Sequence, residues 1–235
     1  MGSSQDEAKR IVGERVASWI EDGMVLGLGT GSTAARAIEA LGARLAKGEI
    51  SDVCGVATSF ASEQLARKYG IRLTTLDEVP EIDLAFDGAD EVDPDLNLIK
   101  GRGAAQTREK IVESQARRFV VLVDESKLVK TLGSRMPLPV EVVPMAVRPV
   151  MDVIRSLGAV PEIRMGQKKD GPIVSDQGLW ILDATFSQGI DAKFVNDTLL
   201  HTPGVLDHGL FLGLATDLLI GRSDGTVSHE RKEEG

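Results

Sequence analysis

Short apolar runs alternate with segments of helical periodicity through the first half of the chain, and this alternation limits the possible folds more than any other feature. Runs of strand length lie at 24–29, 53–58, 82–86 and 119–124. The segments between and before them place apolar side chains on one helical face, as in 6–21. Brief apolar runs separated by helices are typical of βαβ units, so we expect a Rossmann-like parallel sheet covered by helices.

The second half of the chain has a different pattern, beginning near residue 133. A proline-rich stretch is followed by the order strand, helix, strand, strand, helix, strand, which is typical of a ferredoxin-like α+β unit. The apolar segment 209–221 is predicted to return to the first sheet, and the charged tail 228–235 is predicted to be disordered. The expected fold class is therefore α/β, with a catalytic domain at 1–132 and 206–235 and an inserted lid domain at 133–205.

Composition excludes several classes of function. The 235 residues carry a formal net charge of −9, which argues against a general nucleic-acid or anionic-membrane binder, because both need a positive surface. Cys54 is the single cysteine, so an intrachain disulfide or a cysteine-based zinc site is impossible. The first residues lack the apolar core of a signal peptide, and no apolar run reaches 18 residues. These features predict a cytoplasmic protein.

Small, hydroxylic or charged residues follow each of the four apolar runs. They are Thr-Gly-Ser-Thr at 30–33, Thr-Ser at 58–59, Asp-Gly-Ala-Asp at 87–90 and Asp-Glu-Ser-Lys at 124–127. In open α/β sheets the ligand crevice lies outside the carboxyl ends of the strands. We therefore expect these segments to form one ligand site.

The glycine-rich segment 27–35, "GLGTGSTAA", fits neither of two familiar nucleotide motifs. A dinucleotide fingerprint needs glycine where Ser32 stands, and a P-loop needs a Gly-Lys pair that is absent. Close backbone approach, two hydroxyl groups and a helix N-terminus would still suit a phosphate group. A phosphate site and a plain strand-to-helix turn both remain open on this evidence.

Five acidic residues crowd into 87–95, and they invite different interpretations. Asp87 and Asp90 directly follow a strand and are candidates for the site, whereas Glu91, Asp93 and Asp95 fit solvated loop charges. A calcium loop starting at position 93 is disfavoured, because it lacks the required glycine and glutamate. The three histidines are too scattered for a metal site.

A second polar cluster follows at 100–109. Lys100 and Arg102 stand in a loop with two glycines, which can bring backbone N–H groups close to a ligand. Glu109 falls in the next predicted helix, where its neighbours Arg108 and Lys110 do not face it. Ion pairs of Glu109 with these two neighbours are therefore expected to be weak.

Several of these segments together resemble one family, ribose-5-phosphate isomerase of type A. The matching stretches are "GLGTGSTAA", "TSFASEQLA", "DLAFDGADEVDPDLNLIKGRGAAQTREKIV", "VDESKLV", "LPVEVVPMA" and "GVLDHGLFLGLATDLLIG". The resemblance implies interconversion of D-ribose 5-phosphate and D-ribulose 5-phosphate in the non-oxidative pentose phosphate pathway. It also implies an α/β domain with an inserted ferredoxin-like lid, no metal or organic cofactor, and a homodimer or homotetramer. No nucleic-acid or membrane partner is expected, because of the composition described above.

The resemblance also implies roles for individual residues. Glu109 is the expected proton acceptor, Asp87 the group that opens the sugar ring, and Lys100 the cation that stabilises the developing charge. Lys9 stands where some members contact phosphate. The expected substrate-binding residues are Thr30, Gly31, Ser32, Thr33, Asp87, Gly88, Ala89, Asp90, Lys100, Gly101, Arg102, Gly103 and Lys127.

Two other functions compete with this interpretation. One is a non-catalytic sugar-phosphate sensor domain, which would bring a basic DNA-binding segment that this N-terminus lacks. The other is a different sugar-phosphate isomerase or deaminase, or a coenzyme A transferase, of the same broad fold. Formation of ribulose 5-phosphate in the presence of EDTA would discriminate among them.

Overall fold

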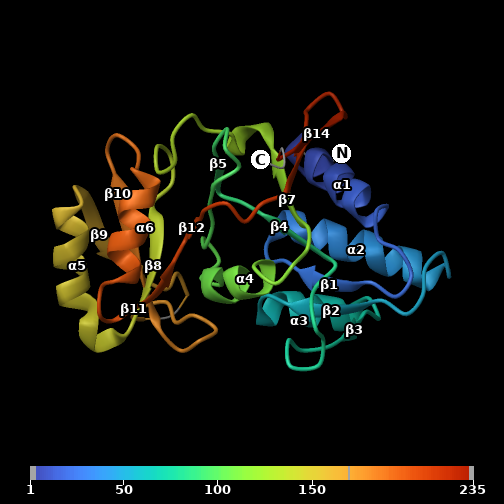
Figure 1. The fold of residues 1–235 in the computed structure, drawn as a ribbon, viewed down its shortest axis with the longest axis horizontal. Coiled ribbons are helices and arrows are strands. Elements are labelled where there is room, and N and C mark those ends of the chain that lie inside the picture. The colour runs from blue at the N-terminus through green and yellow to red at the C-terminus, as the bar shows by residue number, and fades with distance from the viewer. Residues whose placement is uncertain (1–3, 169, 233–235) are drawn as a thin grey trace. The chain divides into compact units, whose positions relative to one another are not determined.

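The computed structural model describes residues 4–168 and 170–232 (Figure 1). The chain divides into two compact units. The first comprises the residues up to 89, 108–128 and the residues from 214 onward, and the second comprises 90–107 and 129–213.

A mixed sheet of seven strands forms the centre of the described part of the first unit. Its order is β14-β13-β7-β4-β1-β2-β3, and only β14 runs antiparallel to its neighbour. The strand order reverses between β1 and β4, which pair with each other at the centre. The strands are β1 (Val25–Leu28), β2 (Cys54–Ala57), β3 (Arg72–Leu73), β4 (Leu84–Gly88), β7 (Phe119–Asp124), β13 (Asp217–Gly221) and β14 (Val227–Arg231). A parallel sheet with this order is the predicted Rossmann-like arrangement.

Helices cover both faces of this sheet. Successive strand residues point to opposite faces, and the even-numbered Leu28 and Phe86 pack with Ile38 in the main core. The odd-numbered Gly27 faces α4 instead, since a Cβ built there would lie 3.1 Å from Val112 Cγ1. The helical elements are α1 (Ser4–Ala17), α2 (Ser32–Ala46), α3 (Phe60–Lys68), α4 (Gln106–Glu113) and the 3₁₀ turn η1 (Glu125–Lys127). In Figure 1, α1 and α2 lie side by side, and they pack against each other.

The second unit contains a four-stranded antiparallel sheet of order β11-β8-β10-β9. Two helices connect its strands in the order strand, helix, strand, strand, helix, strand, which is the predicted ferredoxin-like topology. The elements are β8 (Leu138–Val142), η2 (Pro144–Ala146), α5 (Val147–Ser156), β9 (Ala159–Ile163), β10 (Trp180–Phe186), α6 (Ala192–Leu200) and β11 (Val205–His208). The segment before β10 forms only single bridges, between Met165 and Pro172 and between Val174 and Trp180.

A small three-stranded sheet completes the second unit and explains why its boundaries differ from the sequence-based domains. Its strands are β5 (Glu91–Val92), β6 (Leu98–Ile99) and β12 (Leu210–Phe211), in the order β12-β6-β5. Pairing of β6 with β12 joins 90–107 to the segment that follows β11. The sequence-based boundaries had placed both segments in the catalytic domain. The pairing of β6 with β12 joins segments far apart in the chain, so no local sequence pattern indicates it.

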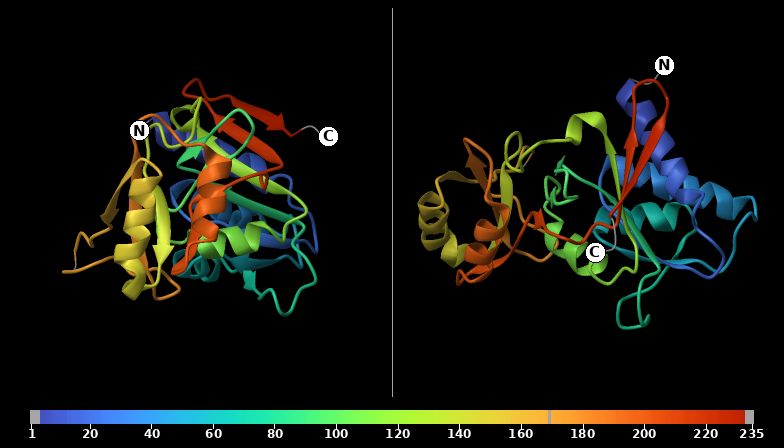
Figure 2. Two further views of the ribbon diagram at one scale, coloured as in Figure 1. Left: turned by 60° about the vertical axis from the view of Figure 1, so that its left-hand side comes forward. Right: turned by 45° about the horizontal axis from the view of Figure 1, so that its top comes forward.

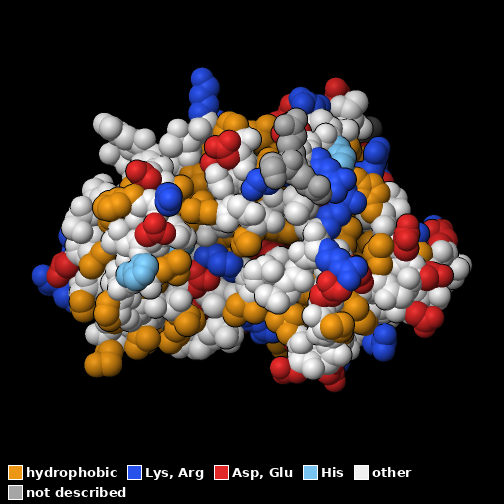
Figure 3. Space-filling model, in the orientation of Figure 1, with side chains coloured by type: hydrophobic (Ala, Val, Ile, Leu, Met, Phe, Trp, Pro, Cys, Tyr) orange, Lys and Arg blue, Asp and Glu red, His pale blue; other side chains and the backbone are white. Residues whose placement is uncertain are grey.

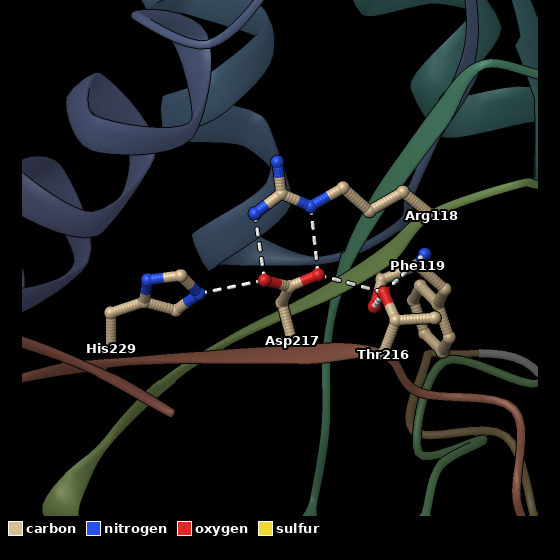
Figure 4. A network of polar contacts seen from close by, with 5 residues as sticks. All are labelled: Arg118, Phe119, Thr216, Asp217 and His229. Carbon is tan, nitrogen blue, oxygen red and sulfur yellow. Dashed lines mark hydrogen bonds and ion pairs between the residues drawn. The ribbon is translucent and has the colours of Figure 1, made fainter. Parts of the chain in front are cut away.

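The predicted disorder of the C-terminal tail is wrong for 228–231. These residues form most of β14, which pairs along its length with β13 in the red hairpin of Figure 2. His229 Nε2 lies 2.7 Å from Asp217 Oδ1, and Arg118 donates two hydrogen bonds to the same carboxylate (Figure 4). Main-chain pairing and this buried acid order a segment that composition alone marks as solvated. Residues 233–235 lie outside the described residues.

Candidate active site

The loops that follow β1 and β4 meet at the point where the strand order reverses. Gly29 donates its N–H to Phe86 O at 3.0 Å, and Thr30 donates its N–H to Asp87 Oδ1 at 2.9 Å. A Cβ at Gly29 would lie 2.5 Å from Asp87 Oδ1, so only glycine allows this approach. This is the place where open α/β sheets bind ligands.

Asp87 is held in one orientation at this position. Its side chain is buried, and Oδ1 also accepts the N–H of Gly88 at 2.6 Å. Two main-chain donors therefore fix a carboxylate at the carboxyl end of a central strand. Ala89 follows as a half-buried residue at the end of this segment.

The end of β2 also contributes to this region. Thr30 Oγ1 lies 2.7 Å from both Thr58 Oγ1 and Ser59 Oγ. Thr58 and Ser59 are buried and fix the Thr30 side chain. Their segment was expected to contribute to the site because it follows a strand, although the two residues were not among the expected substrate-binding residues.

The N-terminus of α2 has no side-chain cap, so its main-chain N–H groups can donate to an anion. Gly31, the residue before the helix, supplies no side-chain cap, and the first turn contains no acidic residue. Ser32 is exposed, and Thr33 faces the end of β4, where a Cβ built at Gly88 would lie 4.0 Å from Thr33 Oγ1. Free N–H groups and two hydroxyl groups at a helix N-terminus suit a phosphate group.

Lys127 lies at the end of β7, the strand next to β4. Asp124 begins the turn η1 by accepting the N–H of Ser126 at 3.0 Å, and Gln5 of α1 donates to its other oxygen at 3.1 Å. Burial would raise the pKa of Asp124, but hydrogen bonds from Ser126 and Gln5 and the charge of Lys127 lower it. Asp124 therefore stays ionised and holds the turn that carries Lys127. Lys9 lies one helical turn after Gln5 and is half-buried.

Glu109 belongs to the buried face of α4. It is 5% exposed, and Val112, one turn further along, packs close to Gly27 of β1. Residues three apart share a helix face. A glutamate on the face that a helix turns toward a sheet is unusual, because burial of a carboxylate needs compensating contacts.

The remaining predicted residues lie in the second unit, in the loop 100–103. Lys100 is 2% exposed, donates its N–H to Gly209 O at 2.9 Å, and has its Nζ 5.5 Å from the centre of the Phe211 ring. Arg102 donates its N–H to Asp90 Oδ2 at 3.0 Å. The Asp90 carboxylate therefore supports this loop directly. The Arg102 side chain is exposed, as is Gly103.

The interpretation of Glu91 as a solvated charge is wrong. Its side chain is fully buried and accepts N–H bonds from Gly133 at 2.6 Å, Arg135 at 2.7 Å and Met136 at 2.8 Å. Glu91 therefore binds and orients the loop 133–136, which lies 42 to 45 residues later in the chain. Asp95 is exposed, as predicted.

Two features of the described residues bear on the class of site: the grouping of possible metal ligands and the length of apolar helices. No three or more His, Cys, Asp or Glu side chains in 4–168 and 170–232 are grouped so that they could hold a metal ion. None of the helices in these ranges has the length and apolar character needed to cross a membrane. Lys and Arg side chains are interspersed with Asp and Glu on the face shown in Figure 3.

Comparison with known proteins gives a consistent result. Residues 54–225 match the family model of ribose 5-phosphate isomerase A (phosphoriboisomerase A). The ribose-5-phosphate isomerase A of Thermosynechococcus vestitus is 54% identical over 92% of this chain and 91% of its own, and that of Pyrococcus abyssi is 48% identical over 96% and 99%.

Solved structures agree with the sequence relatives. A D-ribose-5-phosphate isomerase in complex with phospho-erythronic acid superposes with a TM-score of 0.94 at 45% identity, covering 98% of this chain and all of its own. The ribose 5-phosphate isomerase of Plasmodium falciparum gives a TM-score of 0.93 at 34% identity, with 97% of this chain and 100% of that chain covered.

Proposed function

Because this chain belongs to the ribose 5-phosphate isomerase A family and interconverts D-ribose 5-phosphate and D-ribulose 5-phosphate, we propose that Glu109 moves a proton between C2 and C1 through a cis-enediolate. A single carboxylate serves both carbons when it stands on one face of the sugar. Glu109 lies on the buried face of a short helix that packs on the central strand β1, which supports this role. Partial exclusion of water strengthens a base of this kind.

Asp87 opens the furanose ring in this proposal by taking the proton of the anomeric hydroxyl group and passing it to the ring oxygen as the bond between C1 and that oxygen breaks. The two main-chain N–H groups on Oδ1 hold the carboxylate in place while the ring opens. Lys100 is the proposed cation for the negative charge that develops on O1 and O2. A fixed ammonium group stabilises this charge most when it has no reorganisation to undergo during the reaction.

The phosphate group of the substrate is proposed to bind at the N-terminus of α2 and at Lys127. The uncapped first turn, the hydroxyl groups of Ser32 and Thr33, and the turn held by Asp124 support this assignment. Binding of the phosphate orients the reacting carbons, so that remote binding energy lowers the barrier. The further contacts proposed with the sugar are those of Thr30, Gly31, Gly88, Ala89, Asp90, Gly101, Arg102 and Gly103.

The substitution Glu109→Gln tests the central assignment. It keeps the shape of the side chain but removes the base, so we expect turnover to fall by about 10²–10⁴-fold. Binding of phospho-erythronic acid, measured by calorimetry, is expected to stay within about threefold of wild type, since this substitution spares the phosphate contacts. Glu39→Gln, at an exposed glutamate of α2, is the matched control. Wild-type turnover of Glu109→Gln would refute the assignment.

Three further features are proposed from the family resemblance alone. The enzyme works without a metal ion, assembles as a homodimer or homotetramer, and acts in the cytoplasm. Unchanged activity in EDTA tests the first feature, light scattering coupled to gel filtration tests the second, and cell fractionation tests the third. Activity that EDTA abolishes and a divalent cation restores would overturn the metal-free mechanism.

A further inference from the structure

Arg164 lies just after β9, far along the chain from the predicted site, yet it contacts the loop that carries Lys100. Its Nη1 donates to Gly101 O at 2.8 Å and to Arg102 O at 3.0 Å. The two carbonyl groups are consecutive in the loop, so a single guanidinium nitrogen holds them on the same side.

Asp183 of β10 fixes the guanidinium group of Arg164. Arg164 Nε donates to Asp183 Oδ2 at 2.8 Å, and Nη2 donates to Asp183 Oδ1. Their side chains are only 15% and 22% exposed. A bidentate pair sets the plane of the guanidinium group, which a lysine could not do.

The loop has a backbone conformation that favours glycine, and several contacts hold it. Gly101 has a φ of +105°, and a Cβ there would lie 2.9 Å from Gln106 Oε1. Asp90 binds the N–H of Arg102, and Gly209 O binds the N–H of Lys100. Arg164 adds support from the carbonyl side, where Gly101 O also accepts the N–H of Ala104 at 3.0 Å.

We propose that Arg164, oriented by Asp183, is a positioning residue of the isomerase reaction, which holds the Gly101 and Arg102 carbonyl groups and so fixes the backbone that presents Lys100. The inference rests on the proposed role of Lys100. It gives the ferredoxin-like part of the chain a specific role in catalysis, since Arg164 directly follows β9 and Asp183 lies in the middle of β10.

Arg164→Met tests the proposal by steady-state kinetics. A misplaced Lys100 loses stabilisation of the transition state, so we expect kcat to fall by about tenfold to 10²-fold while KM changes less than about threefold. Arg148→Met, at an exposed arginine paired with Asp152, is the matched control and should leave both constants unchanged. Wild-type kcat in a folded Arg164→Met protein would overturn the proposal.

A double-mutant cycle with Lys100→Met separates positioning from general structural support. If Arg164 acts through Lys100, Arg164→Met has no further effect on kcat in the Lys100→Met background. Equal losses in both backgrounds would overturn the proposal while leaving the role of Lys100 intact. Full activity of Lys100→Met alone would instead refute the proposed role of Lys100, and this inference with it.

Chemical rescue of Arg164→Ala gives a second test, which compares the same protein with and without an added guanidinium ion. Arg164, Asp183, Asp90 and Arg102 line a cavity of about 660 Å³, large enough to admit a free guanidinium ion. Millimolar guanidinium is expected to restore part of kcat to Arg164→Ala and to have no effect on Arg148→Ala. The kcat of Arg164→Lys should be lower than that of Arg164→Ala with added guanidinium, because an ammonium group cannot bind Asp183 and two carbonyl groups in one plane. Failure of rescue in a folded Arg164→Ala protein, together with full recovery by lysine, would contradict the proposal.

Discussion

Glu91 and Asp95 are four positions apart, yet their carboxylates have opposite environments. Glu91 is buried and accepts three main-chain N–H bonds, whereas Asp95 is exposed. Nothing in the local sequence distinguishes them, because the donors to Glu91 come from 133–136. The same limit applies to Arg164, whose carbonyl partners lie about sixty residues earlier in the chain. Long-range hydrogen bonds are invisible to an interpretation based on composition.

Glu91→Gln should therefore destabilise the protein strongly. The amide offers one acceptor oxygen and turns a donor N–H₂ group toward main-chain donors, so we expect the free energy of unfolding to fall by about 3 kcal/mol. Urea unfolding followed by circular dichroism measures this loss. Asp95→Asn is the control, with an expected change of no more than about 0.5 kcal/mol. Equal stability of the two variants would show that the three N–H bonds contribute nothing net.

At the scale of elements, the sequence predicts the secondary structure of a segment more reliably than it predicts the strand with which that segment pairs. Apolar runs and helical periodicity located β1, β2, β4 and β7, and with them the strand ends that carry Thr30, Asp87 and Lys127. Residues at the carboxyl ends of parallel strands converge by the geometry of the fold, so part of the site follows from pattern alone. The pairing of β6 with β12 depends on contacts between distant segments and was not predicted. The pairing of β14 with β13 is a local hairpin, and it was missed because the charged composition of 228–231 suggested disorder.

The turn η1 and the N-terminus of α2 give a prediction at this scale. If both bind the phosphate group, Lys127→Met removes a charged contact that is equally strong in the ground state and the transition state. We expect KM to rise by about tenfold to 10²-fold with little change in kcat. Steady-state kinetics with ribose 5-phosphate measures both constants, and Lys130→Met, at an exposed lysine, is the control. A loss confined to kcat would argue against a phosphate role.

At the scale of the whole molecule, the net charge of −9 does not conflict with an anionic substrate. Recognition of a sugar phosphate needs a few local donors, and in the proposed site these are the uncapped N-terminus of α2 and Lys127. Charge interactions of Asp217 also connect β13 with its two neighbouring strands. Asp217 begins β13 and binds Arg118 just before β7 and His229 of β14. Trp19, beyond α1, contacts both partners: Arg118 Cζ lies 4.3 Å from the centre of the Trp19 ring, and the His229 ring lies 5.0 Å away, centre to centre, tilted by 52°.

This cluster predicts a specific dependence of stability on pH. Burial would raise the pKa of Asp217, but hydrogen bonds from Arg118, His229 and Thr216 outweigh it and lower the pKa to about 2. The folded state therefore binds the Asp217 proton more weakly than the unfolded state, whose aspartates titrate near 3.9. The ionised carboxylate stabilises the fold by about 2 kcal/mol above pH 5, and this contribution is lost as the pH falls from about 4 to 2.

Asp217→Asn should remove that pH-dependent contribution. Urea unfolding at a series of pH values is expected to show a difference of about 2 kcal/mol between wild type and variant at pH 7, shrinking toward pH 2 as wild-type Asp217 takes up its proton. Asp152→Asn, at an exposed acid that pairs with Arg148 and Arg155, should show a much smaller difference over the same range, because exposed ion pairs are weak. A difference for Asp217→Asn that stays constant from pH 7 to pH 2 would mean that the carboxylate contributes by packing alone. In that case the charge interactions of Asp217 with Arg118 and His229 would not be what stabilises the edge of the sheet formed by β13 and β14.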